Sequence, residues 1–348
     1  MELYVYDLNF NLIGMIESCS CKSIIWTENY YACDDFQIEI PYNKELLDIL
    51  KVDYFIKKNS SNRAMLIESI YITSSYNNGR KCPIVTIKGR GTECILERRV
   101  IAYNATVTDS VCNIARKAVI NNLTSPSVSS RKISCVVLGT FPESETIDHI
   151  MQGENLLNFV QNLLQTYKFG FYFKLNFEHQ RFDFTIHSGT DRSTGVLNKV
   201  EFSPDLDNFH TPEYFNESNT HYNCCIARSG EDMNGSIVIA VPTEPAGLER
   251  RELYRDCSDY DVSDLPSTAV SKILTPLQKE FVEKNSTSEN IEGRIVDGVI
   301  FSYNTDYFIG DVVIVNDGFG HKLKKRLISM TEYYSCGSRV LTPVFEDV

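Results

Sequence analysis

The chain has 348 residues, of which 43% are hydrophobic and 23% charged, and its 34 basic and 46 acidic side chains give a formal net charge of −12. A chain of this length is expected to bury its core in two or three domains. The acidic balance argues against a duplex-DNA-binding protein, which normally displays a basic stripe.

The amino terminus, MELYVYDLNFNLIGMIE, lacks the basic, apolar and cleavage-site pattern of a secretory signal. No later stretch reaches the roughly 18 uncharged apolar residues of a membrane span. We therefore expect a chain that is made in a cytoplasm and has no membrane span. The 11 cysteines form no CxxC pair, so we expect reduced, mostly buried thiols rather than a zinc site.

The first third, residues 1–101, consists of short runs of β-branched and aromatic residues such as LYVYD, SIIWTENYY and CPIVTIKG. Turn residues separate the runs about every ten positions, and Asn77-Asn78-Gly79 is a strong hairpin signal. The run FQIEIP alternates apolar and polar residues, as a strand with one wet face does. The pattern predicts a first small antiparallel β-barrel or sandwich.

The middle, residues 102–195, changes character. TDSVCNIARKAVINN and ENLLNFVQNLLQTY carry apolar residues at three- and four-residue spacing, which predicts two amphipathic helices. The segment KFGFYFKLNFEHQRFDFTIHSG predicts a hairpin that turns near Glu178 to Gln180. This part is expected to form an α+β connecting domain.

The last part, residues 196–348, returns to strand-like runs, including YNCCIARSG, GSIVIAVP, GDVVIVND and KKRLISMTEYY. A helix is expected from about Leu265 to Lys284, interrupted at Pro276, so the second β domain would carry a helical insertion around 264–285. Asn316 to Gly318 predicts a tight hairpin turn between two strands. The basic residues at the start of the second of these strands would discourage pairing with strands of other chains.

Motifs of known chemistry are absent from the sequence. His179 and His187 flank a strand without a third ligand nearby, which favours satisfied or exposed histidines over a metal site. No GxSxG, HExxH or Walker A pattern occurs, and the acidic clusters lack the oxygen spacing of a calcium loop. Gly89 and Gly91 lack the spacing of a phosphate loop and indicate a strand-to-turn role. We predict no catalytic, cofactor or metal site.

Three segments resemble a known family, the siphophage tail-hub proteins typified by a ReqiPepy-type tail protein. LYVYDLNFNLIGMIESCSCKSIIWTENYYACDDFQIEIP is similar to the family's opening strand and its siiWt..Yy..gdFel.iP block, and IKGRGTECILERRVI is similar to GkSlesLLdRRiv. FSPDLDNFHTPEYFNESNTHYNCCIARSGED and DYFIGDVVIVNDGFGHKLKKRLISMTEYYSCGSRVLTPVFE are similar to its closing blocks. The blocks occur in the family's order, although the aromatic residue that often follows the RR pair is displaced to Tyr103.

This resemblance implies a mainly β fold in which two tail-tube-like β-barrels bracket a mixed α/β middle. It also implies a homotrimer whose six barrels form a pseudo-six-fold ring at the tail tip of a virion, assembled in the bacterial host cytoplasm. The expected partners are a distal tail protein ring, a tape-measure protein and receptor-binding tail-tip proteins. DNA would pass through the acidic lumen without specific binding, because Lys and Arg supply the binding to phosphate.

Within that interpretation, six residues are candidates for structural or interface roles, and stabilisation of their own chain is an equal alternative for each one. They are Glu97, Arg98, Arg99, Asp306, Gly310 and Asp311. Two other functions stay open, a tail-associated cell-wall or capsule hydrolase and a host-recognition protein that binds glycans. The second would use exposed aromatic residues such as Tyr30, Tyr31 or Tyr303, although half-buried strands explain these residues equally well.

Overall fold

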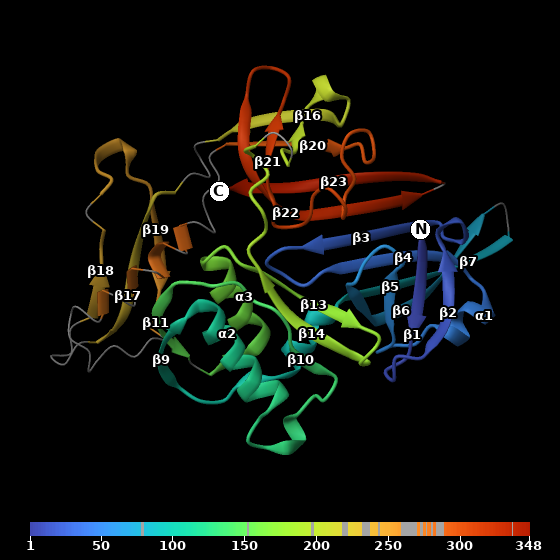
Figure 1. Ribbon diagram of the computed structural model, residues 1–348, viewed down its shortest axis with the longest axis horizontal. Helices are drawn as coiled ribbons and strands as arrows, with labels where there is room; N and C mark the ends of the chain where they lie inside the picture. The colour runs from blue at the N-terminus through green and yellow to red at the C-terminus, as the bar shows by residue number, and fades with distance from the viewer. Residues whose placement is uncertain are drawn as a thin grey trace.

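The computed structural model describes residues 1–77, 80–151, 153–195, 198–217, 222–231, 237–242, 244–258, 270–271, 274–275, 277–279, 281–282, 289–335 and 337–348. The described chain is mainly β, with two larger helices packed at its centre (Figure 1). We divide it into an N-terminal β unit (strands β1–β7), a middle region (η2 to β14) and a C-terminal β unit (β15, β16 and β20–β23).

The N-terminal β unit is built from antiparallel strands whose apolar side chains alternate with polar ones, as β3 shows by burying every second residue. Helix α1 (Lys44–Ile49) begins where the Asn43 side chain accepts the backbone N–H of Glu45 (2.9 Å). The strands are β1 (Glu2–Tyr6), β2 (Leu12–Glu17), β3 (Ser23–Asn29), β4 (Asp35–Pro41), β5 (Phe55–Lys58), β6 (Ala64–Asn77) and β7 (Arg80–Gly91), and Ser18–Ser20 form the 3-10 turn η1.

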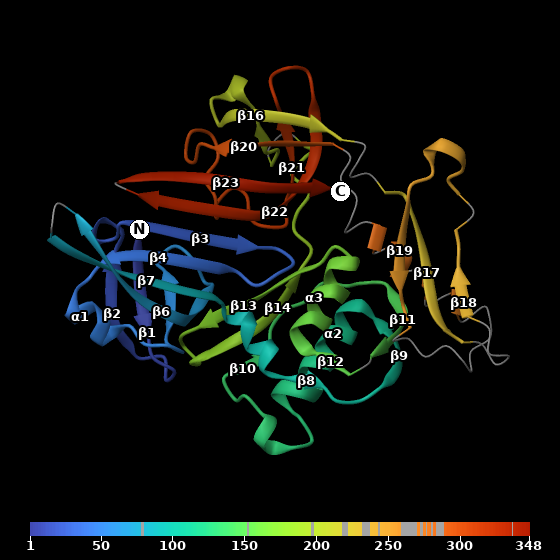
Figure 2. The same cartoon turned by 180° about the vertical axis from the view of Figure 1, so that it is seen from behind.

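The middle region contains both predicted amphipathic helices, α2 (Val111–Val119) and α3 (Leu156–Thr166), which pack together over the sheet β10-β14-β13 (Figure 2). The predicted hairpin is confirmed as β13 (Gly170–Asn176) paired with β14 (Arg181–His187). The other elements are η2 (Thr92–Arg98), β8 (Val100–Ile101), β9 (Ala105–Ser110), η3 (Ile120–Thr124), η4 (Ser129–Arg131), β10 (Val136–Leu138), β11 (Thr146–Met151) and β12 (Glu154–Asn155).

The C-terminal β unit has its own apolar core, to which Tyr307, Val313 and Leu327 contribute fully buried side chains. Its elements are β15 (Glu201–Phe202), η5 (Pro204–Leu206), β16 (Phe209–Asn216), β20 (Glu289–Ile295), β21 (Val312–Asn316), β22 (Lys322–Ser335) and β23 (Ser338–Asp347). Between β16 and β20 the chain forms a separate sheet, β18-β17-β19, with β17 (Cys224–Glu231), β18 (Ile237–Ala240), β19 (Glu252–Asp256) and the turn η6 (Gly247–Glu249).

The two β units share one continuous sheet of 13 strands, because β3 of the first pairs antiparallel with β22 of the second (Figure 1). The strand order runs β16-β20-β23-β22-β3-β4-β7-β6-β5-β1-β2, with β15 and β21 attached beside β22. This path is open at both ends, and the described strands close no barrel. The expectation of a mainly β fold is confirmed, whereas two separate barrels remain a proposal.

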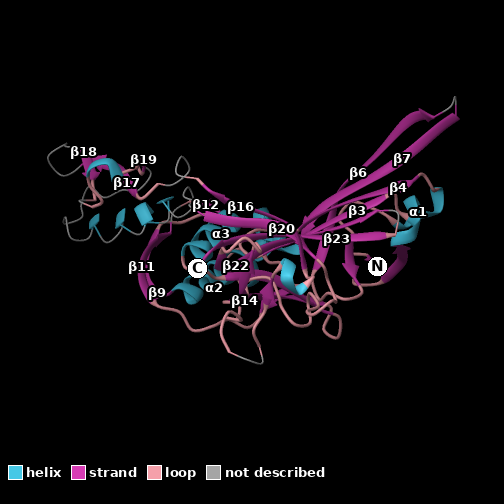
Figure 3. Cartoon of the chain, turned by 90° about the horizontal axis from the view of Figure 1, so that it is seen from above, coloured by secondary structure: helices cyan, strands magenta, loops and turns pink. Residues whose placement is uncertain are grey.

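Several local predictions can be compared with the described residues. Strands β6 and β7 pair up to Asn77 and Arg80, so the hairpin is present, while Asn78 and Gly79 lie outside the described residues. This ribbon projects beyond the rest of its sheet (Figure 3). The hairpin expected at Asn316 to Gly318 is confirmed, because β21 pairs antiparallel with β22 and Gly318 has a φ of +76°. Its turn is longer than predicted, since five residues connect the strands and Asp317 accepts the N–H groups of residues 319 and 321.

The helix expected around 264–285 falls largely outside the described residues, as does Pro276. Its described positions among 270–282 are helical and pack Leu274 and Leu277 against the inserted sheet. Among the described cysteines none forms a disulfide, and five are buried while two are exposed.

Candidate functional site

The six candidate residues lie in two separate places. One group ends η2 and the other lies in the loop before β21, and among the described residues no hydrogen bond or ion pair joins the groups. Three of the six are exposed. Arg98 pairs with Asp53 (2.8 Å, both side chains 51% exposed) and Glu97 pairs with Arg90 (2.6 Å), while Asp306 accepts the backbone N–H four residues earlier (2.7 Å). Exposed ion pairs of this kind stabilise a fold by about 1 kcal/mol at most.

Arg99 connects η2 to the middle region. Its Nε donates to the backbone oxygen of Arg131 (2.7 Å), and its own carbonyl accepts the N–H of Leu156 at the start of α3 (3.0 Å). The side chain is half-buried. Its contacts therefore stabilise its own chain.

Asp311 is a buried connector between the C-terminal β unit and the segment that follows β14. Its carboxylate pairs with the Arg192 guanidinium (2.5 Å) and accepts the backbone N–H groups of Thr190 (2.8 Å) and Phe308 (3.0 Å), with 3% of its side chain exposed. A carboxylate with charge-assisted and backbone donors is held firmly in one position. The loop before β21 is thereby attached to the segment that follows β14.

Position 310 requires a glycine because the ring of Tyr30 lies against it. Its φ of +94° lies in the left-handed region, and a Cβ here would lie 2.2 Å from Cε2 of Tyr30. A Cβ on Gly170 would meet the same ring atom at 2.2 Å. The single proton of the buried Tyr30 hydroxyl is shared between the carbonyls of Lys168 and His187 (3.0 Å each). Tyr30 thus joins all three parts of the chain, and the two glycines make room for its ring.

A buried ionic cluster that the sequence analysis missed holds the two β units together. The Lys58 ammonium of β5 binds Glu28 on β3 (2.8 Å) and also Glu332 on β22, and all three side chains are at most 3% exposed. Nearby, the Arg63 guanidinium binds both carboxylate oxygens of Asp34 (3.1 and 3.2 Å). Removing one member of such a cluster leaves an unpaired buried charge, which costs about 3–5 kcal/mol.

Burial and the charges of this region shift the pKa values of Glu28 and the neighbouring Glu93 in opposite directions. Burial would raise the pKa of Glu28, but the Lys58 and Arg63 charges lower it to about 2. Burial and then the neighbouring Asp34 charge raise the pKa of Glu93 to about 8. One oxygen of Glu93 accepts the N–H of Phe173 (2.9 Å) and the other has no partner among the described residues. Glu93 therefore holds a proton at neutral pH, while Glu28 is ionised.

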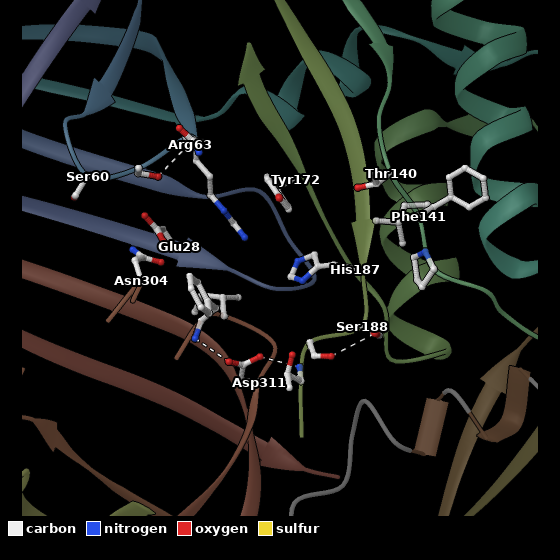
Figure 4. A pocket seen from close by; sticks show the side chains of 18 residues that line it. Glu28, Ser60, Arg63, Thr140, Phe141, Tyr172, His187, Ser188, Asn304 and Asp311 are labelled. Carbon is white, nitrogen blue, oxygen red and sulfur yellow. Dashed lines mark hydrogen bonds between the residues drawn. The ribbon is translucent and has the colours of Figure 1, made fainter. Parts of the chain in front are cut away.

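A polar pocket of about 610 Å³ opens beside this cluster, where the two β units meet the middle region (Figure 4). Its lining includes the predicted residue Asp311 together with Glu28, Arg63 and His187. His187, expected to be satisfied or exposed, has a buried Nε2 with no hydrogen-bond partner in the described structure. Burial lowers the pKa of His187 to about 3, so the ring is neutral.

The aromatic residues proposed for glycan binding are in the wrong place for that role. Tyr30, Tyr31 and Tyr303 are 0%, 8% and 6% exposed, because each fills the junction between the β units. The described residues contain no group of three or more His, Cys, Asp and Glu side chains arranged to hold a metal ion. Among their helices, none has the length and apolar character needed to cross a bilayer.

The fold is that of phage tail proteins. The chain matches the tail protein from Neisseria meningitidis MC58 with a TM-score of 0.60 and 12% identity, over 99% of this chain and 96% of that one. It matches the 43 kDa tail protein of prophage MuSo2 from Shewanella oneidensis with a TM-score of 0.62 and 12% identity, over 100% and 98% of the two chains.

A third structure with this fold is the E. coli c3393 protein, described as a type VI secretion component similar to T4 tail proteins gp27 and gp5. Its TM-score is 0.50 at 10% identity, over 94% of this chain and 74% of that chain. No curated protein matches the sequence. The family model of the siphovirus ReqiPepy6 Gp37-like proteins matches residues 2–345. The chain belongs to this family of siphovirus tail proteins.

Proposed function

We propose that the chain is a non-enzymatic hub protein of the tail tip, which forms a homotrimeric, pseudo-six-fold ring that closes or continues the tail tube. The ring would link the tube to a distal tail protein, a tape-measure protein and receptor-binding proteins. Family membership supports a tail protein, and the fold shared with c3393 supports a hub, because that protein resembles T4 gp27 and gp5.

The observation that carries the proposal is the pair of β units in one chain. Each has its own buried core, and the pairing of β3 with β22 fixes them side by side in one sheet. Three copies of such a chain would present six β units, the number needed to match a six-fold tube. The division into residues 1–101, 102–195 and 196–348 belongs to this proposal.

The exposed residues Glu97, Arg98 and Asp306 are the candidates for contacts between copies, whereas Arg99, Gly310 and Asp311 act within their own chain. The net charge of −12 suits a lumen through which DNA slides, since carboxylates outnumber the cations that would bind phosphate. A ring whose lumen-facing side chains were mainly basic would overturn the part of the proposal that concerns DNA.

The first experiment is to measure the mass of the purified protein by light scattering and to image the particles by negative stain. We expect a trimer with a six-fold outline, either alone or after addition of the distal tail protein. A chain that stays monomeric in the presence of that partner would refute the hub proposal.

Arg98→Glu together with Arg99→Glu should give a folded chain that no longer trimerises. Because Arg99 also makes contacts within its own chain, Arg98→Glu alone is measured beside it. Lys117→Glu is the matched control, since Lys117 is also an exposed cation (52%) paired with a carboxylate. Trimerisation that survives both arginine variants, or fails equally in the control, would exclude this surface as the interface.

A further inference from the structure

The pocket beside the ionic cluster has the size and construction of a ligand site. Its volume of about 610 Å³ lies within the range of about 300–1,000 Å³ that is usual for small-molecule sites. Segments far apart in sequence form its wall, among them residues 60–63, residues 140–142, residues 186–190 and the loop before β21 (Figure 4). Asn304 on this loop has a left-handed φ of +64°, a backbone strain that is common at functional sites.

The wall of the pocket offers hydrogen-bonding groups that the described structure leaves unused. The side chains of Ser60, Asn62 and Thr190 make no hydrogen bond to another described residue, although all three line the pocket. The Nε2 atom of His187 is buried without a partner. That atom has almost no accessible surface and lies out of a ligand's reach, whereas the Ser60, Asn62 and Thr190 side chains are exposed and can exchange solvent for a bound hydroxyl group.

The charged groups of the wall are already neutralised by neighbours. Glu28 is paired with Lys58, and Asp311 with Arg192. Arg63 binds Asp34. Because every charge has a partner, an ionic ligand would gain little and would lose its hydration. An apolar ligand would bury the unused polar groups and is disfavoured as well.

Aromatic rings border this polar wall. Phe141 and Phe308 line the pocket with 40% and 41% exposure. Tyr172 also lines it, and the carbon of the Arg63 guanidinium lies 4.5 Å from the tyrosine ring centroid. An aromatic ring packs well against the apolar C–H face of a ligand. A sugar ring has such a face and also carries hydroxyl groups that can bond to the polar wall.

We propose that this pocket binds a neutral oligosaccharide, whose hydroxyl groups would bond to the unused polar side chains and whose ring faces would lie against Phe141 and Phe308. None of the proposed contacts between copies, Glu97, Arg98 and Asp306, lines the pocket, although Asp306 lies on the loop that forms part of its wall. Glycan binding is measured on the protein in solution, so its failure and the failure of trimerisation are separate results.

The test is binding of the intact protein to an array of di- to hexasaccharides built from glucose, galactose, mannose, rhamnose and N-acetylglucosamine, with uronic-acid and phosphate-bearing glycans beside them. The best ligand is then titrated by calorimetry. We expect binding to a neutral glycan, weakened about tenfold or more by Phe308→Ala and by Asn62→Ala. Because Asn62 is exposed and its side chain makes no described hydrogen bond, its variant should fold even if the Phe308 variant does not.

Phe319→Ala is the matched control, because this phenylalanine is 79% exposed in the loop between β21 and β22 and does not line the pocket. The affinity of this variant for the glycan should equal that of the unaltered protein. The proposal is overturned if no neutral glycan binds, if anionic glycans bind better, or if the Asn62 variant binds as tightly as the control.

Discussion

Replacing Glu93 with glutamine should remove most of a fall in thermal stability that we expect between pH 4.5 and pH 8. The side chain is 1% exposed, and its pKa rises on folding from 4.5 to about 8. The folded chain therefore keeps a proton that the unfolded chain releases above pH 4.5. The stability from this group is fully present below pH 4.5 and is lost as the pH rises towards 8.

The size of the effect follows from the pKa difference of about 3.5 between 4.5 and 8. One pKa unit corresponds to about 1.4 kcal/mol, so the full difference is roughly 5 kcal/mol. Unfolding entropies near 2.1 cal/mol/K per residue give roughly 0.7 kcal/mol/K for 348 residues that unfold together. The expected loss in Tm is thus roughly 7 °C.

The assay is scanning calorimetry of both proteins at pH 5, 6, 7 and 8. Glutamine keeps the oxygen that accepts the Phe173 N–H but does not titrate. The Tm of the variant minus the Tm of the unaltered protein should therefore increase as the pH rises. Glu97→Gln, an exposed carboxylate four residues later, is the control and should show no such trend. A constant difference between the Glu93 variant and the unaltered protein from pH 5 to pH 8 would refute a buried, protonated Glu93.

Two further changes test the junction between the β units by urea unfolding. Lys58→Met should lower the free energy of unfolding by about 3–5 kcal/mol, because it removes the ion-pair partner of the buried Glu28 and leaves the buried Glu332 with Arg339 alone. Lys57→Met on the other face of β5 should cost less than about 1 kcal/mol, and equal losses would contradict the buried cluster. Gly310→Ala should destabilise more than Gly320→Ala by about 1–3 kcal/mol, since both have a left-handed φ (+94° and +115°) but only the first would place a Cβ against Tyr30. No difference between the two glycine variants would contradict the packing of that ring.

The local elements were largely predictable because they depend on neighbours in sequence. Both central helices, the hairpin of β13 and β14 and the alternation in β4 follow from apolar spacing. Helix α1 was missed, since six residues carry too little periodicity to be recognised. The buried Glu28 had a signal, because it continues the every-second-residue series of Ile24 and Trp26 on β3.

The junction itself could not be predicted, because it depends on which distant segments meet. The pairing of β3 with β22 uses backbone groups that every residue carries, so neither strand identifies its partner. The cation for Glu28 comes from β5, and nothing near residue 58 in the sequence indicates it. Gly310 and Asp311 were identified as candidates, but the resemblance could not say that they act through Tyr30 and Arg192.

The pairing of β3 with β22 also determines the order in which the chain can fold during synthesis. Thr27 and Thr331, which contact each other across the two strands, are separated by 304 positions. At about 5–20 residues per second, a ribosome needs roughly 15–60 s to cover that interval. Throughout that time, β3 presents an unpaired edge beside a finished β4, and such edges are where nascent chains pair wrongly. Completion of the N-terminal β unit is thus deferred until the last residues of the chain emerge.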